Sequence, residues 1–261
     1  MTDSPASRTV LDVRDVSLRF GGVRALHEVD MDVETRSICG LVGPNGAGKT
    51  SLFNCISGYY RPSAGSIRIS GRDVLVISPH ELAGLGVART FQHPILQVSE
   101  SVLTNVLVGG HLQLHEGVLA HLFALPSTGR AERRLRTRAL ELLDYLSLGA
   151  VTGSPAGDLP YGSQKRVEIA RALLSDPHLL LLDEPASGLP HQEVGELGAV
   201  IARLRDDLSL TILIVEHHMG LISAITDKVV VLVEGEKIAE GTAAHVQSNP
   251  AVISAYLGGA A

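Results

Sequence analysis

The chain has 261 residues, 45% of them hydrophobic, and a formal net charge of -6. This length and composition are enough to bury a full core, as one large domain or as one domain with an inserted subdomain. The acidic balance argues against a broad nucleic-acid surface, because duplex affinity comes mainly from neutralising phosphates with Lys and Arg. Cys39 and Cys55 are expected to pack as small apolar side chains. Two such thiols suggest a reducing cytoplasm. The N-terminus has no apolar signal core, and no stretch reaches the ~18 uninterrupted apolar residues of a membrane span, so we expect membrane association only through a partner.

Three kinds of apolar pattern occur along the chain. Residues 10–33 alternate apolar and polar around Gly21-Gly22, and Ile67 and Ile69 repeat that alternation, which predicts antiparallel strands with one buried face. Continuous apolar runs at 38–42, 179–182, 210–215 and 229–233 predict parallel strands with helices on both faces. Between about 93 and 160 helical periodicity replaces the strand signal, with one helix expected to follow Pro126-Ser127-Thr128-Gly129. We therefore expect an α/β fold with a mainly parallel sheet, an antiparallel β-subdomain and an inserted helical subdomain.

The segment GPNGAGKT lies between an apolar run and a helical pattern, which is the context of a phosphate-binding P-loop. Its glycines let backbone N–H groups point inward, Lys49 can reach the β- and γ-phosphates, and Thr50 offers a hydroxyl to Mg²⁺. We expect a nucleoside triphosphate to be held by Gly43, Pro44, Asn45, Gly46, Ala47, Gly48, Lys49, Thr50 and Ser51.

The apolar run 179–182 ends in two carboxylates, Asp183 and Glu184, at the sheet edge where open α/β folds bind ligands. The alternative is an acidic turn, but the upstream P-loop favours Asp183 as a Mg²⁺ ligand, through water, and Glu184 as the group that orients the attacking water. His217 follows the next apolar run and is expected at the same edge, within reach of a γ-phosphate.

In chain order, the P-loop, Thr90-Phe91-Gln92, the segment LPYGSQ at 159–164, LLLLDEP and Val215-Glu216-His217 resemble the motifs of ABC-transporter ATPase subunits. The resemblance covers nearly the whole chain and implies ATP as the nucleotide. It implies that Gln92 senses Mg²⁺ and the γ-phosphate beside the membrane partner, that His217 is the switch histidine, and that Phe20 stacks on adenine. For Phe20 the alternative is core packing at a strand end. The implied division is a nucleotide-binding core (1–92 and 165–241), a helical subdomain with the signature segment (93–164) and a C-terminal helical tail (242–261).

The family resemblance also implies that two subunits sandwich two ATP molecules, each between one P-loop and the other subunit's signature segment. The signature residues here are Tyr161, Gly162, Ser163 and Gln164. Two positions depart from the family pattern. Pro160 replaces a serine and lacks both its hydroxyl and an N–H, and Pro190 replaces an acidic or amide residue that crosses the dimer interface. We expect a slower composite site, or compensation by Ser163 or partner groups.

Several segments are similar to those of bacterial branched-chain amino-acid importer ATPases and their hydrophobic or polar amino-acid relatives: Arg19-Phe20-Gly21-Gly22, 89–93, Tyr161-Gly162, 215–219 and 255–258. This resemblance implies a peripheral position on the cytoplasmic face of the membrane. The implied partners are a second ATPase subunit (identical or different), integral-membrane permeases and, indirectly, a substrate-binding protein. Residues 93–116 are expected to contact the permease. A soluble ABC ATPase of an assembly machine and an export-type ATPase stay open as alternatives; a GTPase is disfavoured, because the sequence has no Asn-Lys-x-Asp segment.

Overall fold

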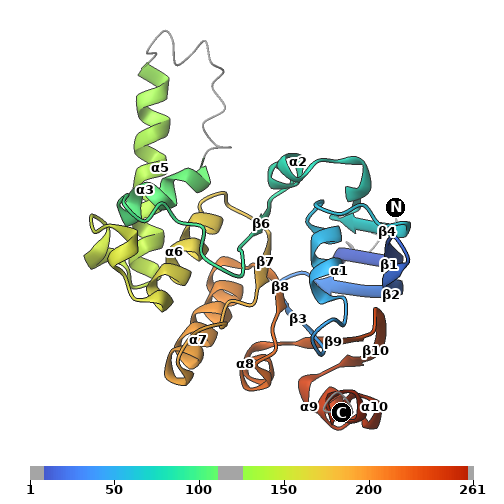
Figure 1. The fold of residues 1–261 in the computed structure, drawn as a ribbon. Helices are drawn as coiled ribbons and strands as arrows, with labels where there is room; N and C mark the ends of the chain where they lie inside the picture. The colour runs from blue at the N-terminus through green and yellow to red at the C-terminus, as the bar shows by residue number, and fades with distance from the viewer. Residues whose placement is uncertain (1–8, 111–125, 258–261) are drawn as a thin grey trace, which may run out of the picture.

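The computed structural model describes residues 9–110 and 126–257, which form two sheets and the helices that cover them (Figure 1). The first sheet is antiparallel, in the order β2-β1-β4-β5. It consists of β1 (Thr9–Phe20), β2 (Val23–Glu34), β4 (Ala64–Ile69) and the short β5 (Arg72–Asp73). Gly21 has φ 57° in the turn between β1 and β2, a conformation that glycine adopts without strain. The expected hairpin and its extension by a second alternating segment are confirmed.

The second sheet is mainly parallel, in the order β10-β9-β3-β8-β7-β6. Its parallel strands are β3 (Ile38–Val42), β6 (Val87–Arg89), β7 (Leu179–Asp183), β8 (Thr211–Val215) and β9 (Lys228–Val233). β10 (Glu236–Gly241) closes one edge in the antiparallel direction. All four continuous apolar runs are therefore strands of one sheet, which confirms the expected α/β fold.

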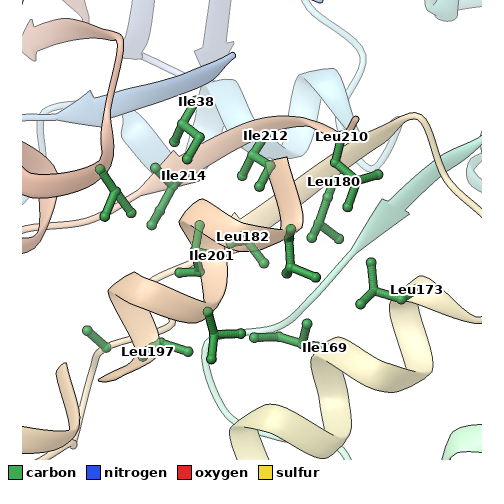
Figure 2. Packing of buried hydrophobic residues seen from close by; sticks show 14 of the residues in the cluster. Ile38, Ile169, Leu173, Leu180, Leu182, Leu197, Ile201, Leu210, Ile212 and Ile214 are labelled. Atoms are coloured by element: carbon green, nitrogen blue, oxygen red, sulfur yellow. The ribbon is translucent and has the colours of Figure 1, made fainter. Parts of the chain in front are cut away.

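Alternate residues of this sheet enter two separate cores, because successive side chains of a strand point to opposite faces. On one face, Ile38, Leu180 and Ile212 pack against α6 (Tyr161–Leu173), α7 (His191–Leu208) and α8 (Met219–Ile225), as Figure 2 shows for the first two helices. On the other face, Cys39 and Leu213 pack against α1 (Lys49–Ile56) and the antiparallel sheet. This two-sided burial explains why the strands read as continuous apolar runs. Burial raises the pKa of the thiols of both cysteines to about 12.

The helical part consists of α3 (Val102–Leu107), α5 (Pro126–Tyr145) and α6, which pack on one another away from the antiparallel sheet (Figure 1). The apolar face of α5 is buried as the periodicity predicts, while its arginines are exposed. The prediction that this helix begins after Gly129 is wrong, because α5 already begins at Pro126. The first turn of a helix accepts proline, since the N–H that proline lacks has no intrahelical partner there.

The remaining elements are short. α2 (Pro79–Gly84) begins with a capping box in which Ser78 and Glu81 bond each other's backbone N–H. The 3-10 turns are η1 (Val74–Val76), η3 (Gly149–Val151) and η4 (Ala156–Asp158), and the C-terminal helices are α9 (Ala243–Gln247) and α10 (Pro250–Leu257). Within 9–110 and 126–257, every helix is too short or too polar to cross a membrane.

Candidate nucleotide site

The carboxyl ends of four neighbouring parallel strands meet at one edge of the larger sheet (Figure 1). The register aligns Leu41 with Val215, Asp183 with Val215 and Arg89 with Leu181. The segments that follow β3, β7, β8 and β6 therefore leave the sheet side by side. This topology brings four motifs that are far apart in sequence to one place, as open α/β sheets do at their ligand sites.

The P-loop after β3 borders a cavity of about 280 Å³. Gly43 and Gly48 have φ values of 152° and 95°, and a Cβ at either would lie 2.1 and 2.6 Å from the carbonyl oxygens of Leu232 and Ala25. A Cβ at Gly46 would meet nothing within 4 Å. The loop is therefore pressed against backbone on one side and open on the other. The cavity is lined by Val23, Arg24, Ala25, Glu184 and residues 45–51.

The donors around this cavity fit a phosphate chain. α1 begins at Lys49 after Gly48, which has no side-chain cap, so the amides of its first turn have no intrahelical acceptor and face an anion favourably. The buried Lys49 Nζ donates to the carbonyl oxygens of Gly43, at 2.7 Å, and Pro44, at 2.9 Å. Burial lowers the pKa of the Lys49 ammonium, and the Glu184 carboxylate acts in the opposite direction.

Three of the expected catalytic side chains come together at Glu184. Its backbone adopts a left-handed conformation, with φ 43°, and its N–H donates to the carbonyl oxygen of Val215 at 2.9 Å. This sharp turn directly after β7 places the carboxylate in the lining of the P-loop cavity. Glu184 Oε2 accepts a hydrogen bond from Gln92 Nε2 at 2.9 Å, and His217 Nδ1 lies 3.7 Å from the same oxygen.

The neighbouring Asp183 is buried and paired with Arg89, whose Nη2 lies 2.9 Å from Asp183 Oδ2. Burial raises the pKa of Asp183, and the Arg89 guanidinium opposes that rise. Arg89 also donates to Asn54 Oδ1 and Ser57 Oγ of the P-loop helix segment. No role for Arg89 follows from the sequence, where its only signal is its place in the segment 89–93. The carboxylate of Asp183 and the hydroxyl of Thr50 are oxygen ligands of the kind Mg²⁺ prefers.

The signature residues lie apart from the P-loop cavity, beside a second hollow of about 410 Å³ lined partly by Gly162, Ser163 and Pro190. α6 begins directly after Pro160, which provides no side-chain cap to that helix. Gln164 Nε2 donates to the carbonyl oxygen of Leu159 at 2.9 Å. The Tyr161 ring lies under the ammonium of Lys165 at 5.4 Å. In this chain the P-loop and the signature segment thus border two different hollows.

Phe20 lies at the end of β1 and is 47% exposed, so its alternative assignment as a core residue is wrong. Its ring meets the ring of Tyr60 edge-on, with centroids 5.2 Å apart. Phe20 does not line the P-loop cavity itself, but Val23, its partner across the hairpin, does.

A third hollow, of about 440 Å³, lies between the segment after β6 and the helical part. Its lining includes Tyr59, Arg89, Phe91, Ile95 and Val108. Tyr59, Ile95 and Val108 are exposed although they are apolar or aromatic. This surface covers part of the segment expected to contact a permease; residues 111–116 of that segment lie outside the described residues.

A P-loop after one parallel strand and paired carboxylates after another define a nucleotide-binding α/β protein, and the comparisons with known proteins agree. A family model described as "ABC transporter" matches residues 26–187, and one described as "Branched-chain amino acid ATP-binding cassette transporter" matches residues 236–261. The chain therefore belongs to the ABC transporter family, as one of its ATP-binding ATPases.

Individual relatives extend this similarity over the whole length. The high-affinity branched-chain amino acid transport ATP-binding protein BraF of Pseudomonas aeruginosa is 41% identical, with 97% of this chain and 99% of the relative covered. The corresponding protein LivG of Escherichia coli is 40% identical with the same coverage. Among solved structures, the ADP conformation of MJ1267, an ATP-binding cassette of an ABC transporter, has a TM-score of 0.84 and 30% identity, covering 96% of this chain and 99% of that one.

Proposed function

We propose that this chain hydrolyses ATP to drive an importer of branched-chain or related amino acids. The proposal is supported by relatives named as branched-chain amino acid transport proteins, which are 40% and 41% identical over nearly the full length. The match of residues 236–261 to a model of the same description adds a second, C-terminal similarity.

One observation carries the assignment of the catalytic groups: Glu184 lines the P-loop cavity and its Oε2 meets both Gln92 and His217. Residues 43–51 hold the phosphates and Phe20 holds the adenine. Thr50, Gln92 and, through water, Asp183 would hold Mg²⁺, which when bound would supply charge neutralisation at the phosphate oxygens. Glu184 orients the attacking water and accepts its proton, and His217 contacts the γ-phosphate.

The separation of the P-loop and signature hollows supports a dimer in which Tyr161, Gly162, Ser163 and Gln164 meet the partner's nucleotide. The partner is a second ATPase subunit, identical or different. The exposed apolar groove around Ile95 and Val108 supports permease contact by the segment 93–116, on the cytoplasmic side of the membrane. A substrate-binding protein then acts through the permeases. The proposed division is the core (1–92 and 165–241), the helical subdomain (93–164) and the tail (242–261); its boundary after 164 falls inside α6, which contacts both α3 and α5 and the strand β6.

The test is uptake of labelled leucine, isoleucine and valine by cells in which this chain has been deleted and then restored. Restoration with the natural chain should recover uptake of at least one of them. Restoration with Glu184→Gln, checked for equal abundance at the membrane, should not. Unchanged uptake after deletion would overturn the importer function. Increased retention of a substrate on deletion would indicate an exporter, and co-purification with a scaffold but no membrane protein would indicate an assembly ATPase.

A further inference from the structure

One buried carboxylate connects two loops of the nucleotide site. Glu216 follows β8 directly and is fully buried. Its Oε1 accepts the backbone N–H of Ala186 at 2.7 Å. Its Oε2 accepts the backbone N–H groups of His217, at 3.1 Å, and His218, at 3.3 Å. A single side chain thus satisfies three backbone donors from two segments that lie 30 residues apart in sequence.

These donors lie at or near two of the residues with proposed catalytic side chains. Ala186 lies two positions after Glu184, and His217 is itself a bonded donor. The Glu184 and His217 side chains face each other, with 3.7 Å between Oε2 and Nδ1. Charge-assisted hydrogen bonds that a carboxylate accepts are stronger than neutral ones, so the three bonds to Glu216 tie the two backbones together.

We propose that Glu216 is a positioning residue for ATP hydrolysis, which sets the geometry between Glu184 and His217 by joining the loops that bear them. The inference rests on the proposed roles of Glu184 and His217. Glutamine has nearly the same shape but only one acceptor oxygen, and its amide end is a donor. In Glu216→Gln, either Ala186 or the two histidine amides therefore face a donor, and the loops separate at that point.

The primary measurement is steady-state ATP turnover of the full chain, with nucleotide affinity measured separately by a fluorescent ATP analogue. In Glu216→Gln we expect kcat to fall about 10- to 100-fold, because small displacements of catalytic groups have effects of that size. KM and analogue affinity should change less than about threefold, because the P-loop is not part of this connection.

The matched control is at the opposite end of the same strand. Thr211 is also buried, and its Oγ1 accepts the backbone N–H of Arg36 at 3.0 Å. Thr211→Val removes one buried acceptor far from the nucleotide site, so it should keep kcat within about twofold while lowering stability. If Glu216→Gln is poorly folded, Glu216→Asp keeps the carboxylate but shortens its reach, and should also lower kcat selectively.

The His217→Ala variant distinguishes a positioning role of Glu216 from a general loss of folding. If Glu216 acts through His217, Glu216→Gln should cost much less in single-turnover experiments on the His217→Ala variant than on the natural chain. Three results would each overturn the inference. The first is an equal loss of single-turnover rate in the natural chain and in His217→Ala, and the second is a natural kcat in Glu216→Gln. The third is the same loss of kcat in Thr211→Val. If Glu184→Gln and His217→Ala retained natural turnover, the proposed catalytic roles would fail instead, so the two failures are distinguishable.

Discussion

Replacing Arg89 with methionine should destabilise the whole chain, because it leaves the buried Asp183 carboxylate without its counter-charge. The side chains of Arg89 and Asp183 are only 13% and 10% exposed, with 2.9 Å between Nη2 and Oδ2. Removing one partner of a buried ion pair costs about 3–5 kcal/mol. At roughly 2–4 °C per kcal/mol for a chain of this size class, Tm should fall by about 6–20 °C.

The assay is urea unfolding followed by circular dichroism, with Arg138→Met as the matched control. Arg138 pairs with Glu141 at 3.4 Å, but these side chains are 45% and 60% exposed, so the control should stay within about 0.5 kcal/mol of the natural chain. Adding Asp183→Asn to Arg89→Met should recover part of the loss, because the uncompensated charge is then absent. Equal unfolding free energies for Arg89→Met and Arg138→Met, or no recovery in the double variant, would refute this reasoning.

The pKa of Asp183 determines how the free energy of unfolding of Arg89→Met, relative to that of the natural chain, changes with pH. Burial raises the pKa of Asp183 above its ordinary 3.8, and loss of the opposing Arg89 raises it further. A carboxyl group with a raised pKa binds more protons in the folded state, so its contribution to the free energy of unfolding decreases as pH rises from 3.8 through the folded pKa. The deficit of Arg89→Met relative to the natural chain should therefore be smaller near pH 4 than near pH 7.

Three further variants test the nucleotide site. Glu184→Gln should keep ATP binding, lose most hydrolysis and trap the dimer. Turnover assays would measure the loss of hydrolysis, and gel filtration with ATP would detect the dimer. Undiminished turnover would show that Glu184 is not the base. Lys49→Ala should weaken ATP binding itself in a direct titration, because the ammonium proposed to contact the phosphates is lost, and unchanged affinity would contradict that role. Pro160→Ser should increase turnover by returning a hydroxyl to the start of α6; no change would remove the idea that Pro160 slows the composite site.

The parts of the fold that were predictable are those in which local sequence and tertiary burial agree. The strand 38–42 reads as apolar throughout because Ile38 faces one core and Cys39 faces the other. The P-loop was recognisable because positive-φ glycines at fixed spacing leave a local signature, and Gly43 and Gly48 have these conformations in the structure. The start of α5 was not predictable, because Pro126 is equally compatible with a turn and with a first helical turn.

The connections that hold the site together were not predictable, since they depend on which polar side chain lies opposite which backbone group. The sequence contains Glu216 within a recognisable motif, but the reach of its carboxylate to Ala186 follows only from the adjacency of β7 and β8. Arg89 likewise precedes Gln92 by three positions, whereas its partner Asp183 is 94 residues further along the chain. A charged residue at a strand end has the same local signature whether its partner is water or another buried charge.

The segment around Gln92 shows what such connections do. The side chain of Gln92 donates a hydrogen bond to Glu184, and the carbonyl oxygen of Gln92 accepts one from the buried Lys165 of α6. The N–H of Phe91 donates to Glu168 Oε1 of the same helix at 3.1 Å. Burial lowers the pKa of Lys165 and raises that of Glu168, while each charge opposes the shift of the other. Because breaking buried charged contacts is costly, we expect the backbone of Gln92 to follow any displacement of α6. The helical part and Glu184, the proposed catalytic base, are therefore joined through Phe91 and Gln92, and we expect movement of either to change the position of the other.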